Sequence, residues 1–421
     1  MSSLGTKLNP TGKTEPGKPQ SPPGPRSAVW QLAWISFAEL LGMSLWFAGT
    51  AVAPALSRQF NLTPGGIAWL TMSVQLGFVA GTLVSALINL PDIVPPRRVF
   101  AVGSLAGAFF TLSSVIAPNE FVLIAGRFLT GAALAGVYPP AMKIAAGWTL
   151  HRRGTALGLL IGALTLGSAG PHLLAVFSAP VAWRLAMMAV SVQAVIGAFI
   201  MLAIVRDGPY VIATARFDPR AALSIVSNKK ARAATLGYLG HMWELYGCWA
   251  WIAAFGAASA AIHGASADTW GPLTAVITFT AGAPACLIAG VAADRVGKAR
   301  VARMAMLASG SIALVTPWLF GRDPILLGIG AAVWGAVVIA DSAQFSALIT
   351  EHSDPAHVGT ALTLQTCAGF LLTMVSIRVT AAFAESFGWQ WALAPLAIGP
   401  ALGAWAVGGA TEKSAEERRD G

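Results

Sequence analysis

The sequence predicts an all-α integral membrane protein with twelve transmembrane helices in two six-helix, pseudo-symmetric bundles. Hydrophobic residues make up 56% of the chain and charged residues only 11%, whereas a soluble domain carries about 25% charged residues. An acidic motif also occurs twice, because Glu-Leu-x-Gly-x-x-x-Trp at residues 39–46 returns at residues 244–251, 205 positions later. Together, these observations predict a duplicated bundle that lies in lipid.

Apolar stretches long enough to cross a bilayer recur from one end of the chain to the other. About 20 residues cross a hydrocarbon core of ~30 Å, and over such a length only a helix satisfies its own backbone in lipid. The twelve predicted spans are 29–56, 67–90, 99–117, 121–148, 154–178, 182–206, 233–258, 269–293, 301–320, 324–350, 358–384 and 389–411.

The order of these spans predicts the organisation of the chain. An N-terminal bundle covers residues 29–206, a central cytoplasmic loop 207–232, and a C-terminal bundle 233–411. Residues 1–28 are rich in Pro, Gly, Ser and Lys without hydrophobic periodicity, which predicts a disordered tail. Residues 412–421 form a second, short tail.

Basic residues are concentrated in the segments that would lie on one side of the membrane. With the N-terminus in the cytoplasm, 21 of the 27 Lys and Arg residues fall in cytoplasmic segments, and the opposite side holds only Arg58, Arg184 and Arg322. This asymmetry is the positive-inside bias. It predicts a multi-pass protein of the cytoplasmic (inner) membrane with both termini in the cytoplasm. The net charge of +9 then needs no nucleic acid partner.

Cys248, Cys286 and Cys367 all lie inside predicted spans. Their spacing fits neither a metal site nor a disulfide framework, and we interpret them as buried apolar residues. No cofactor and no metal are expected. Glycines at steps of four, as at Gly158 and Gly162, are typical of helices that pack closely in a membrane.

The loop between the eighth and ninth spans resembles the signature cytoplasmic loop of the major facilitator superfamily. It contains Gly290, Asp294, Arg295, Gly297, Lys298 and Arg300 in the family's spacing. Glycine permits a tight turn between packed helices, and the acid and the bases form a charge cluster at the membrane surface. The resemblance implies a gate motif that latches the two halves when the cytoplasmic side is closed. The alternative is that the bases only set the orientation of the chain.

The matching loop between the second and third spans keeps Asp92, Arg97 and Arg98 but lacks the glycines. The fourth span contains Arg127-x-x-Thr130-Gly131, which is similar to the arginine motif of the same family in that helix. The fifth span only partly matches the glycine-proline motif of its exporters. The resemblance implies two six-helix bundles with a substrate site near the midplane, lined by the first and seventh helices.

Glu39 and Glu244 lie about ten and eleven residues inside their spans, and therefore close to mid-bilayer. A charged side chain at that depth costs at least ~2.5 kcal/mol and often marks a proton or ion path. We predict that at least one of the two carries protons. The alternative is a permanent structural pair, for which the candidate partners inside spans are Arg127, His172, His241 and Arg378.

Helical spacing predicts the neighbours of these two glutamates. Glu39 shares a face with Trp46, and Glu244 shares one with His241 and Trp251. We expect both carboxylates and both indoles to face one cavity, which could receive a cation or a flat organic molecule. The other candidate polar residues of the pathway are Asp341, Tyr138 and Gln365.

The function favoured by these features is proton-coupled secondary transport of a small organic solute by alternating access. The expected state in the lipid bilayer is a monomer, since one chain holds both halves. One alternative is an inorganic-anion porter of the nitrate, nitrite or cyanate type, although spans 67–90 and 269–293 lack the arginines that nitrate carriers use there. Another is a non-transporting substrate sensor. An enzyme is not expected, because no metal, nucleotide-loop or nucleophile pattern occurs.

Overall fold

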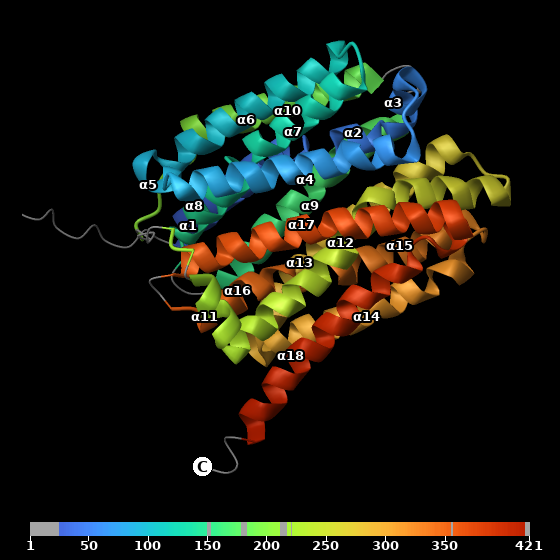
Figure 1. Cartoon of the computed structure of the whole chain (residues 1–421). Coiled ribbons are helices and arrows are strands. Elements are labelled where there is room, and N and C mark those ends of the chain that lie inside the picture. The colour runs from blue at the N-terminus through green and yellow to red at the C-terminus, as the bar shows by residue number, and fades with distance from the viewer. Residues whose placement is uncertain are drawn as a thin grey trace, which may run out of the picture.

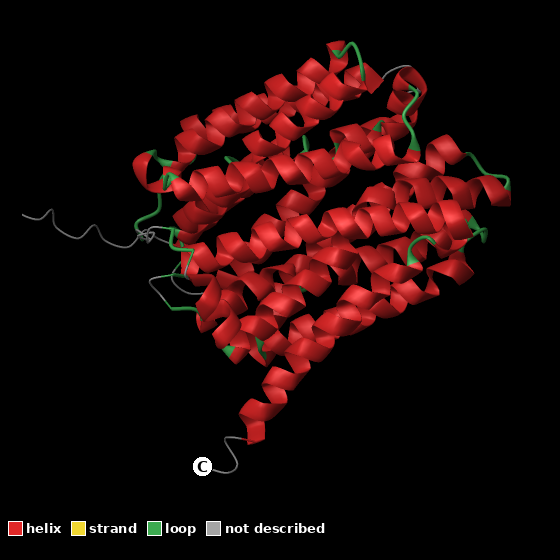
Figure 2. Ribbon diagram, viewed as in Figure 1, coloured by secondary structure: helices red, strands yellow, loops and turns green. Residues whose placement is uncertain are grey.

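The chain is helical throughout the part that the structure describes (Figures 1 and 2). The computed structural model describes residues 25–149, 153–177, 183–210, 217–219, 221–354 and 357–416. No strand occurs within these ranges, so the all-α prediction is confirmed. Eleven helical segments among them are long and apolar enough to cross a membrane. Most of the two predicted tails, residues 1–24 and 417–421, lies outside the described residues.

The first half of the chain forms the helices coloured blue to green in Figure 1. They are α1 (Pro25–Met43), α2 (Ala48–Ala51), α3 (Ala53–Phe60), α4 (Pro64–Leu87), α5 (Leu90–Ile93), α6 (Pro96–Ser113), η1 (Ser114–Ile116), α7 (Glu120–Leu134), α8 (Tyr138–Ala146), α9 (Arg153–Phe177) and α10 (Trp183–Ala203).

The second half forms the yellow-to-red helices, which gather on the other side of the molecule in Figure 1. They are α11 (Ala221–Ser227), α12 (Lys229–His263), α13 (Ala267–Val296), α14 (Lys298–Leu319), α15 (Pro324–Val338), α16 (Ser342–His352), α17 (Val358–Phe387), η3 (Trp389–Trp391), η4 (Ala394–Ala397) and α18 (Ile398–Glu416). Helix α12 thus begins inside the predicted central loop.

The two ends of the bundle differ in charge. We call the end where α13 and α14 meet the basic end, because Arg295 and Lys298 flank the turn there. Helix α4 ends on the same side and α6 begins there with Arg97 and Arg98. Helices α5 and α11 mark this end at the left of Figure 1, and α3 marks the opposite end.

The outer face of the bundle is apolar along the middle of the helices. Val102, Phe109, Phe199, Ile288 and Trp405 are between 66% and 76% exposed. Soluble proteins rarely leave so many large apolar side chains uncovered. These side chains therefore form the surface that faces lipid.

Helix breaks interrupt several of the predicted spans. The chain leaves the helix between α7 and α8, at 135–137, and between α15 and α16, at 339–341. The last helical residues before these two breaks, Leu134 and Val338, are 204 positions apart. The first span is also broken, at 44–47, whereas its counterpart α12 continues over 35 residues.

Close helix packing repeats in the two halves as well. Gly131 of α7 lies against the carbonyl oxygen of Val74 in α4, and Gly335 of α15 lies against that of Thr278 in α13. A side chain at either glycine would collide with backbone. Both members of this contact recur 204 positions apart, so the repeat in the sequence has a counterpart in the packing.

Glycines also bring the two halves of the chain together. A Cβ atom at Gly158 of α9 would lie 2.8 Å from the Cys286 oxygen of α13, and one at Gly162 would lie 2.9 Å from the Ala283 oxygen. Small residues at this spacing let two helices approach closely in a membrane. The interpretation of these glycines as packing residues is confirmed, and their partner helix belongs to the other half.

We expect Gly158→Ala to destabilise the protein by about 1–3 kcal/mol, because the added methyl group overpacks the contact between α9 and α13. The matched control is Gly170→Ala on the same helix, where the nearest atom to the added Cβ would be 3.8 Å away. Thermal unfolding in detergent can be followed by the reaction of the three buried cysteines with a thiol-reactive dye. An equal loss in both variants would contradict the prediction.

Candidate functional site

Eight aromatic side chains fill the middle of the interface between the halves, and we call them the ring cluster. The first half contributes Trp46, Phe47, Phe78 and His172. The second half contributes Tyr246, Trp249, Phe279 and Phe370. All eight are buried, with at most 5% of any one exposed.

Ring contacts join the two halves directly. The ring centroids of Trp46 and Phe370 are 5.3 Å apart, and those of Phe47 and Phe279 are 5.4 Å apart. His172 stacks on Phe279, with centroids 5.6 Å apart and planes inclined by 23°. Aromatic pairs at such distances contribute about 0.5–1.5 kcal/mol beyond the burial of their area. The ring contacts therefore contribute to holding the halves together.

The break in the first span brings Trp46 and Phe47 into this cluster. Residues 44–47 leave the helix, so the carbonyl groups within the break lack the regular partners of a continuous helix. The guanidinium of Arg127 on α7 supplies replacements, because its Nη2 donates to the Leu45 oxygen at 3.1 Å and to the Trp46 oxygen at 2.5 Å. Arg127 is completely buried. It is thus a cap for a broken helix and not a partner of Glu39.

Glu39 lies on α1, one side of which packs against α8, α9 and α10. The residue is completely buried, and neither carboxylate oxygen has a hydrogen-bond partner within the described ranges. Tyr138 begins α8, one of the helices that pack against α1. Its side chain is partly buried against the hydrophobic core.

Glu244 has a different environment from Glu39. Its Oε2 accepts a hydrogen bond from the Ser309 hydroxyl at 2.6 Å, and its Oε1 accepts one from the Trp334 indole at 2.8 Å. Both donors belong to the second half, on α14 and α15. The expectation that both carboxylates face one cavity therefore has to be corrected, since Glu244 turns into its own half, where two donors satisfy it.

His241 and Asp341 form a second buried polar pair in the second half. The His241 Nδ1 lies 2.7 Å from the Asp341 Oδ1, and both side chains are at most 3% exposed. Asp341 occupies the break between α15 and α16, so the pair ties that break to α12. The helical spacing on α12 could not predict this partner.

The remaining pathway candidates have separate positions. The indole of Trp251 donates to the Ile377 oxygen of α17 at 3.0 Å, so it stabilises the second half and does not belong to the ring cluster. Trp46 does belong to the cluster, and its indole Nε1 has no acceptor in the described part of the chain. Gln365 on α17 is buried, and its Nε2 likewise finds no acceptor there.

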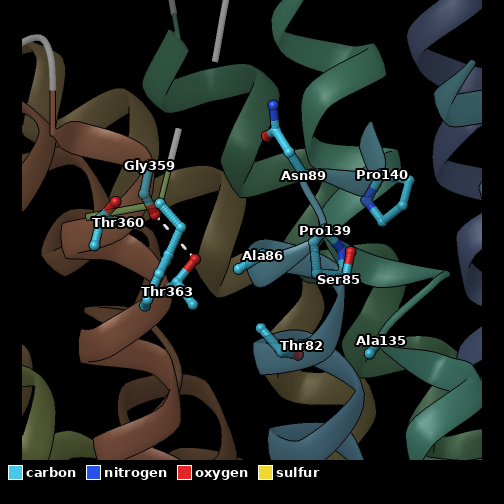
Figure 3. Close-up of a pocket in the computed structure, with 11 residues that line it drawn as sticks. Thr82, Ser85, Ala86, Asn89, Ala135, Pro139, Pro140, Gly359, Thr360 and Thr363 are labelled. Carbon is cyan, nitrogen blue, oxygen red and sulfur yellow. Dashed lines mark hydrogen bonds between the residues drawn. The ribbon is translucent and has the colours of Figure 1, made fainter. Parts of the chain in front are cut away.

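A cleft of about 110 Å³ opens between the halves at the basic end (Figure 3). Figure 3 shows Thr82, Ser85, Ala86 and Asn89 on one wall and Gly359, Thr360 and Thr363 on the other. Thr82 is one helical turn from Phe78, and Thr363 is two turns from Phe370. The floor of the cleft therefore lies close to the ring cluster.

A hydrogen bond joins the gate motif of the second half to the first half. The Asp294 Oδ2 accepts a hydrogen bond of 3.4 Å from the hydroxyl of Thr155 at the start of α9. Gly290 is buried in α13, and Gly297 makes the turn into α14 with φ of +94°. Lys298 pairs with Glu351 at the end of α16, and Arg295 and Arg300 are exposed.

In the corresponding motif of the first half, Arg97 contacts the segment that follows α10. Arg97 binds Asp207 through two hydrogen bonds of 3.1 and 3.0 Å, and its Nη1 donates to the Val205 oxygen. These contacts hold the end of α10 against the start of α6. Arg98 is exposed, and the side chain of Asp92 lies outside the described part of the chain.

Comparison with known proteins assigns the family. A sequence model of the Major Facilitator Superfamily matches residues 35–277. The chain belongs to the major facilitator superfamily. Proteins of this family are transporters, so the expectation that the chain is not an enzyme is confirmed.

Individual members of the superfamily match more weakly. The niacin transporter NiaP of Acinetobacter baylyi is 27% identical over 169 residues, which are 40% of this chain and 38% of that protein. The efflux pump radE of Floropilus chiversii is 31% identical over 180 residues, 41% of this chain and 32% of that protein. The chain thus spans about a third of the length of these relatives.

A solved superfamily structure shares the fold. It is the crystal structure of a bacterial homologue of the human lysosomal transporter Spinster in an inward-facing and unoccupied conformation. The TM-score is 0.67 at 14% sequence identity, over 91% of this chain and 98% of that one. This likeness concerns the fold alone.

The sequence did not single out the four phenylalanines of the ring cluster. Phe47, Phe78, Phe279 and Phe370 look like any other apolar residues of a span, because burial in a helix gives a phenylalanine no distinguishing pattern. The available signal was the position of Phe47 beside Trp46, directly after the repeated acidic motif.

We expect Ser309→Ala to lower stability by about 1–3 kcal/mol, because it removes a donor from the buried Glu244 carboxylate. The matched control is Ser311→Ala on the same helix, since the exposed Ser311 hydroxyl bonds only to the Leu307 oxygen of its own turn. Unfolding in detergent compares the two variants. Equal stability of both would refute the assignment of Ser309 as a support for Glu244.

Proposed function

We propose that this protein is a secondary active transporter that moves a small organic solute across the cytoplasmic membrane by alternating access, coupled to protons through Glu39. The observation that carries the proposal is the complete burial of Glu39 without a hydrogen-bond partner among the described residues. An ionised carboxylate is costly in such a place. A proton on Glu39 removes that cost, and contact with water would allow the proton to leave.

The proposed architecture is two six-helix bundles. The broken first span, added to the eleven long apolar helical segments, gives the twelve crossings of the membrane. The internal repeat supports it, since the acidic motif, the helix breaks and the glycine contacts all recur about 205 positions apart. In this architecture the two bundles rock about a site near the midplane. The ring cluster lies at that level and closes the path between the cleft and the opposite end.

The proposed orientation places the basic end in the cytoplasm, as the positive-inside bias favours. The cleft would then open to the cytoplasm, so the state described here is one that exchanges solute with that side. In the opposite state the cytoplasmic side closes, and Asp294 with its neighbouring bases would strengthen its contact with α9. One chain holds all these parts, which supports a monomer.

The ring cluster favours an organic solute over an inorganic anion. Large aromatic surfaces bind ring systems and alkyl chains, whereas a small anion requires charged donors that converge on it. Two of the matching relatives are named as a niacin transporter and an efflux pump, which is consistent with a small organic solute.

We expect Glu39→Gln to abolish proton movement driven by the solute while solute exchange along its own gradient continues, because glutamine mimics a carboxyl that cannot lose its proton. Purified protein in liposomes with an internal pH dye would be tested with niacin, an organic amine and a neutral sugar. The control is Glu385→Gln, which changes an exposed glutamate at the opposite end. Wild-type coupling in Glu39→Gln would exclude Glu39 as the proton carrier, and transport without proton movement in the wild type would exclude coupling altogether.

Cysteine labelling tests the proposed orientation. The native cysteines are buried, so they contribute little background. We expect His263→Cys, at the exposed opposite end, to react with a membrane-impermeant maleimide on intact cells. Ile93→Cys, which replaces a side chain 70% exposed at the basic end, should react only after permeabilisation. The reverse pattern would place the basic end outside the cell.

A further inference from the structure

We propose that the ring cluster binds the aromatic ring of an organic acid, with the acid group held by the indole of Trp46 and the imidazole of His172. The inference rests on the proposed alternating access, because a ligand enters the packed ring cluster only when the halves separate. It specifies both the shape and the charge of the ligand. Three observations carry it.

The first observation is the kind of polar atom that remains without a partner inside the cluster. The indole Nε1 of Trp46 can only donate a hydrogen bond. It is buried and has no acceptor among the described residues, and the same holds for both ring nitrogens of His172. Buried polar groups are nearly always satisfied. These unpaired groups lie at the interface between the halves, so a ligand that enters when the halves separate can supply the missing hydrogen-bond acceptors.

The second observation is the charge next to the cluster. The guanidinium of Arg127 contacts the backbone oxygens of Leu45 and Trp46, at the segment that carries Trp46 and Phe47 of the cluster. No acidic side chain in the described ranges forms an ion pair with it. Glu244, which would repel an anion, turns away into the second half and is held there by Ser309 and Trp334. Glu39, seven residues before Trp46, adds no charge while it carries the proton proposed above, so the local charge in that state favours an anion over a cation.

The third observation is the arrangement of the rings relative to the cleft. Phe78 and Phe370 stand 4.9 Å apart from opposite halves, within one or two helical turns of Thr82 and Thr363 on the cleft walls. A flat solute that enters from the basic end meets these rings first. When the halves separate, ring pairs between them are lost, and a solute in the gap can form new pairs with the same rings. An aromatic solute replaces the lost contact energy better than an alkyl group of equal size.

The test is equilibrium binding of radiolabelled benzoate to the purified full-length protein, with cyclohexanecarboxylate and benzylamine as competitors. Cyclohexanecarboxylate keeps the charge without the aromatic ring, and benzylamine keeps the ring with the opposite charge. We expect benzoate to bind, cyclohexanecarboxylate to compete about tenfold less well, and benzylamine not to compete. Absence of benzoate binding, or equal or stronger competition by either analogue, would overturn the proposal.

Two conservative variants identify the site. Trp46→Phe removes the indole donor, and His172→Phe removes the ring nitrogens, while both keep a ring in the cluster. Each should weaken benzoate binding about tenfold, the loss of one hydrogen bond to a charged group. The matched control Trp405→Phe changes a tryptophan that is 76% exposed on the outer face and should bind benzoate like the wild type. Wild-type affinity in both cluster variants would overturn the assignment.

The liposome assay separates this proposal from the proposed function. If benzoate binds in the expected pattern but no solute crosses the membrane, the site stands and the transport proposal fails. If the organic amine or the sugar is carried with protons while benzoate does not bind, transport stands and the aromatic-acid site is overturned.

Discussion

The broken first span depends on the buried guanidinium of Arg127. In lipid a helix cannot end in mid-span unless other groups satisfy its free carbonyls, and Arg127 does so for Leu45 and Trp46. The break in turn allows Trp46 and Phe47 to enter the same cluster, although neighbours in a straight helix point about 100° apart. The ring contacts between the halves therefore depend on Arg127 of α7. The arginine motif of that helix thus has a structural role, which is to bind the free carbonyls of the first span.

The two copies of the repeat have diverged at matching positions. In the register of the helix breaks, Arg127 corresponds to Ala331, and α12 has no break to be capped. Trp334, which donates to Glu244, corresponds to Thr130, whose hydroxyl donates to the Gly126 oxygen of its own helix. Each half thus keeps the repeated glutamate but gives it a different environment. The second half fixes its carboxylate to two neighbouring helices, whereas the Glu39 carboxylate has no hydrogen-bond partner among the described residues.

The sequence was sufficient for the all-α membrane class and the family, because composition, span length and the gate motif are local properties of the chain. It also located Glu39 at a depth where a carboxylate is unusual. It could not predict the turn of Glu244 into the second half, since the donors Ser309 and Trp334 are 65 and 90 residues away. The sequence did not predict the cap on the first span for the same reason, because Arg127 is about 80 residues from the carbonyls it binds. Helical periodicity orders the faces of one helix, whereas these contacts depend on which helices become neighbours.

Aromatic contacts suit an interface that has to open and close. A buried ion pair between the halves would leave an unpaired charge on each side whenever the halves separated, at a cost of several kcal/mol. Ring pairs such as Trp46–Phe370 and Phe47–Phe279 contribute less individually, and the same surfaces can pack on the ring of a solute. A ligand shifts such an equilibrium only as far as it binds one state better than the other. A solute that replaces the lost ring contacts therefore lowers the cost of separation, and this is how an occupied site would favour the movement that an empty one resists.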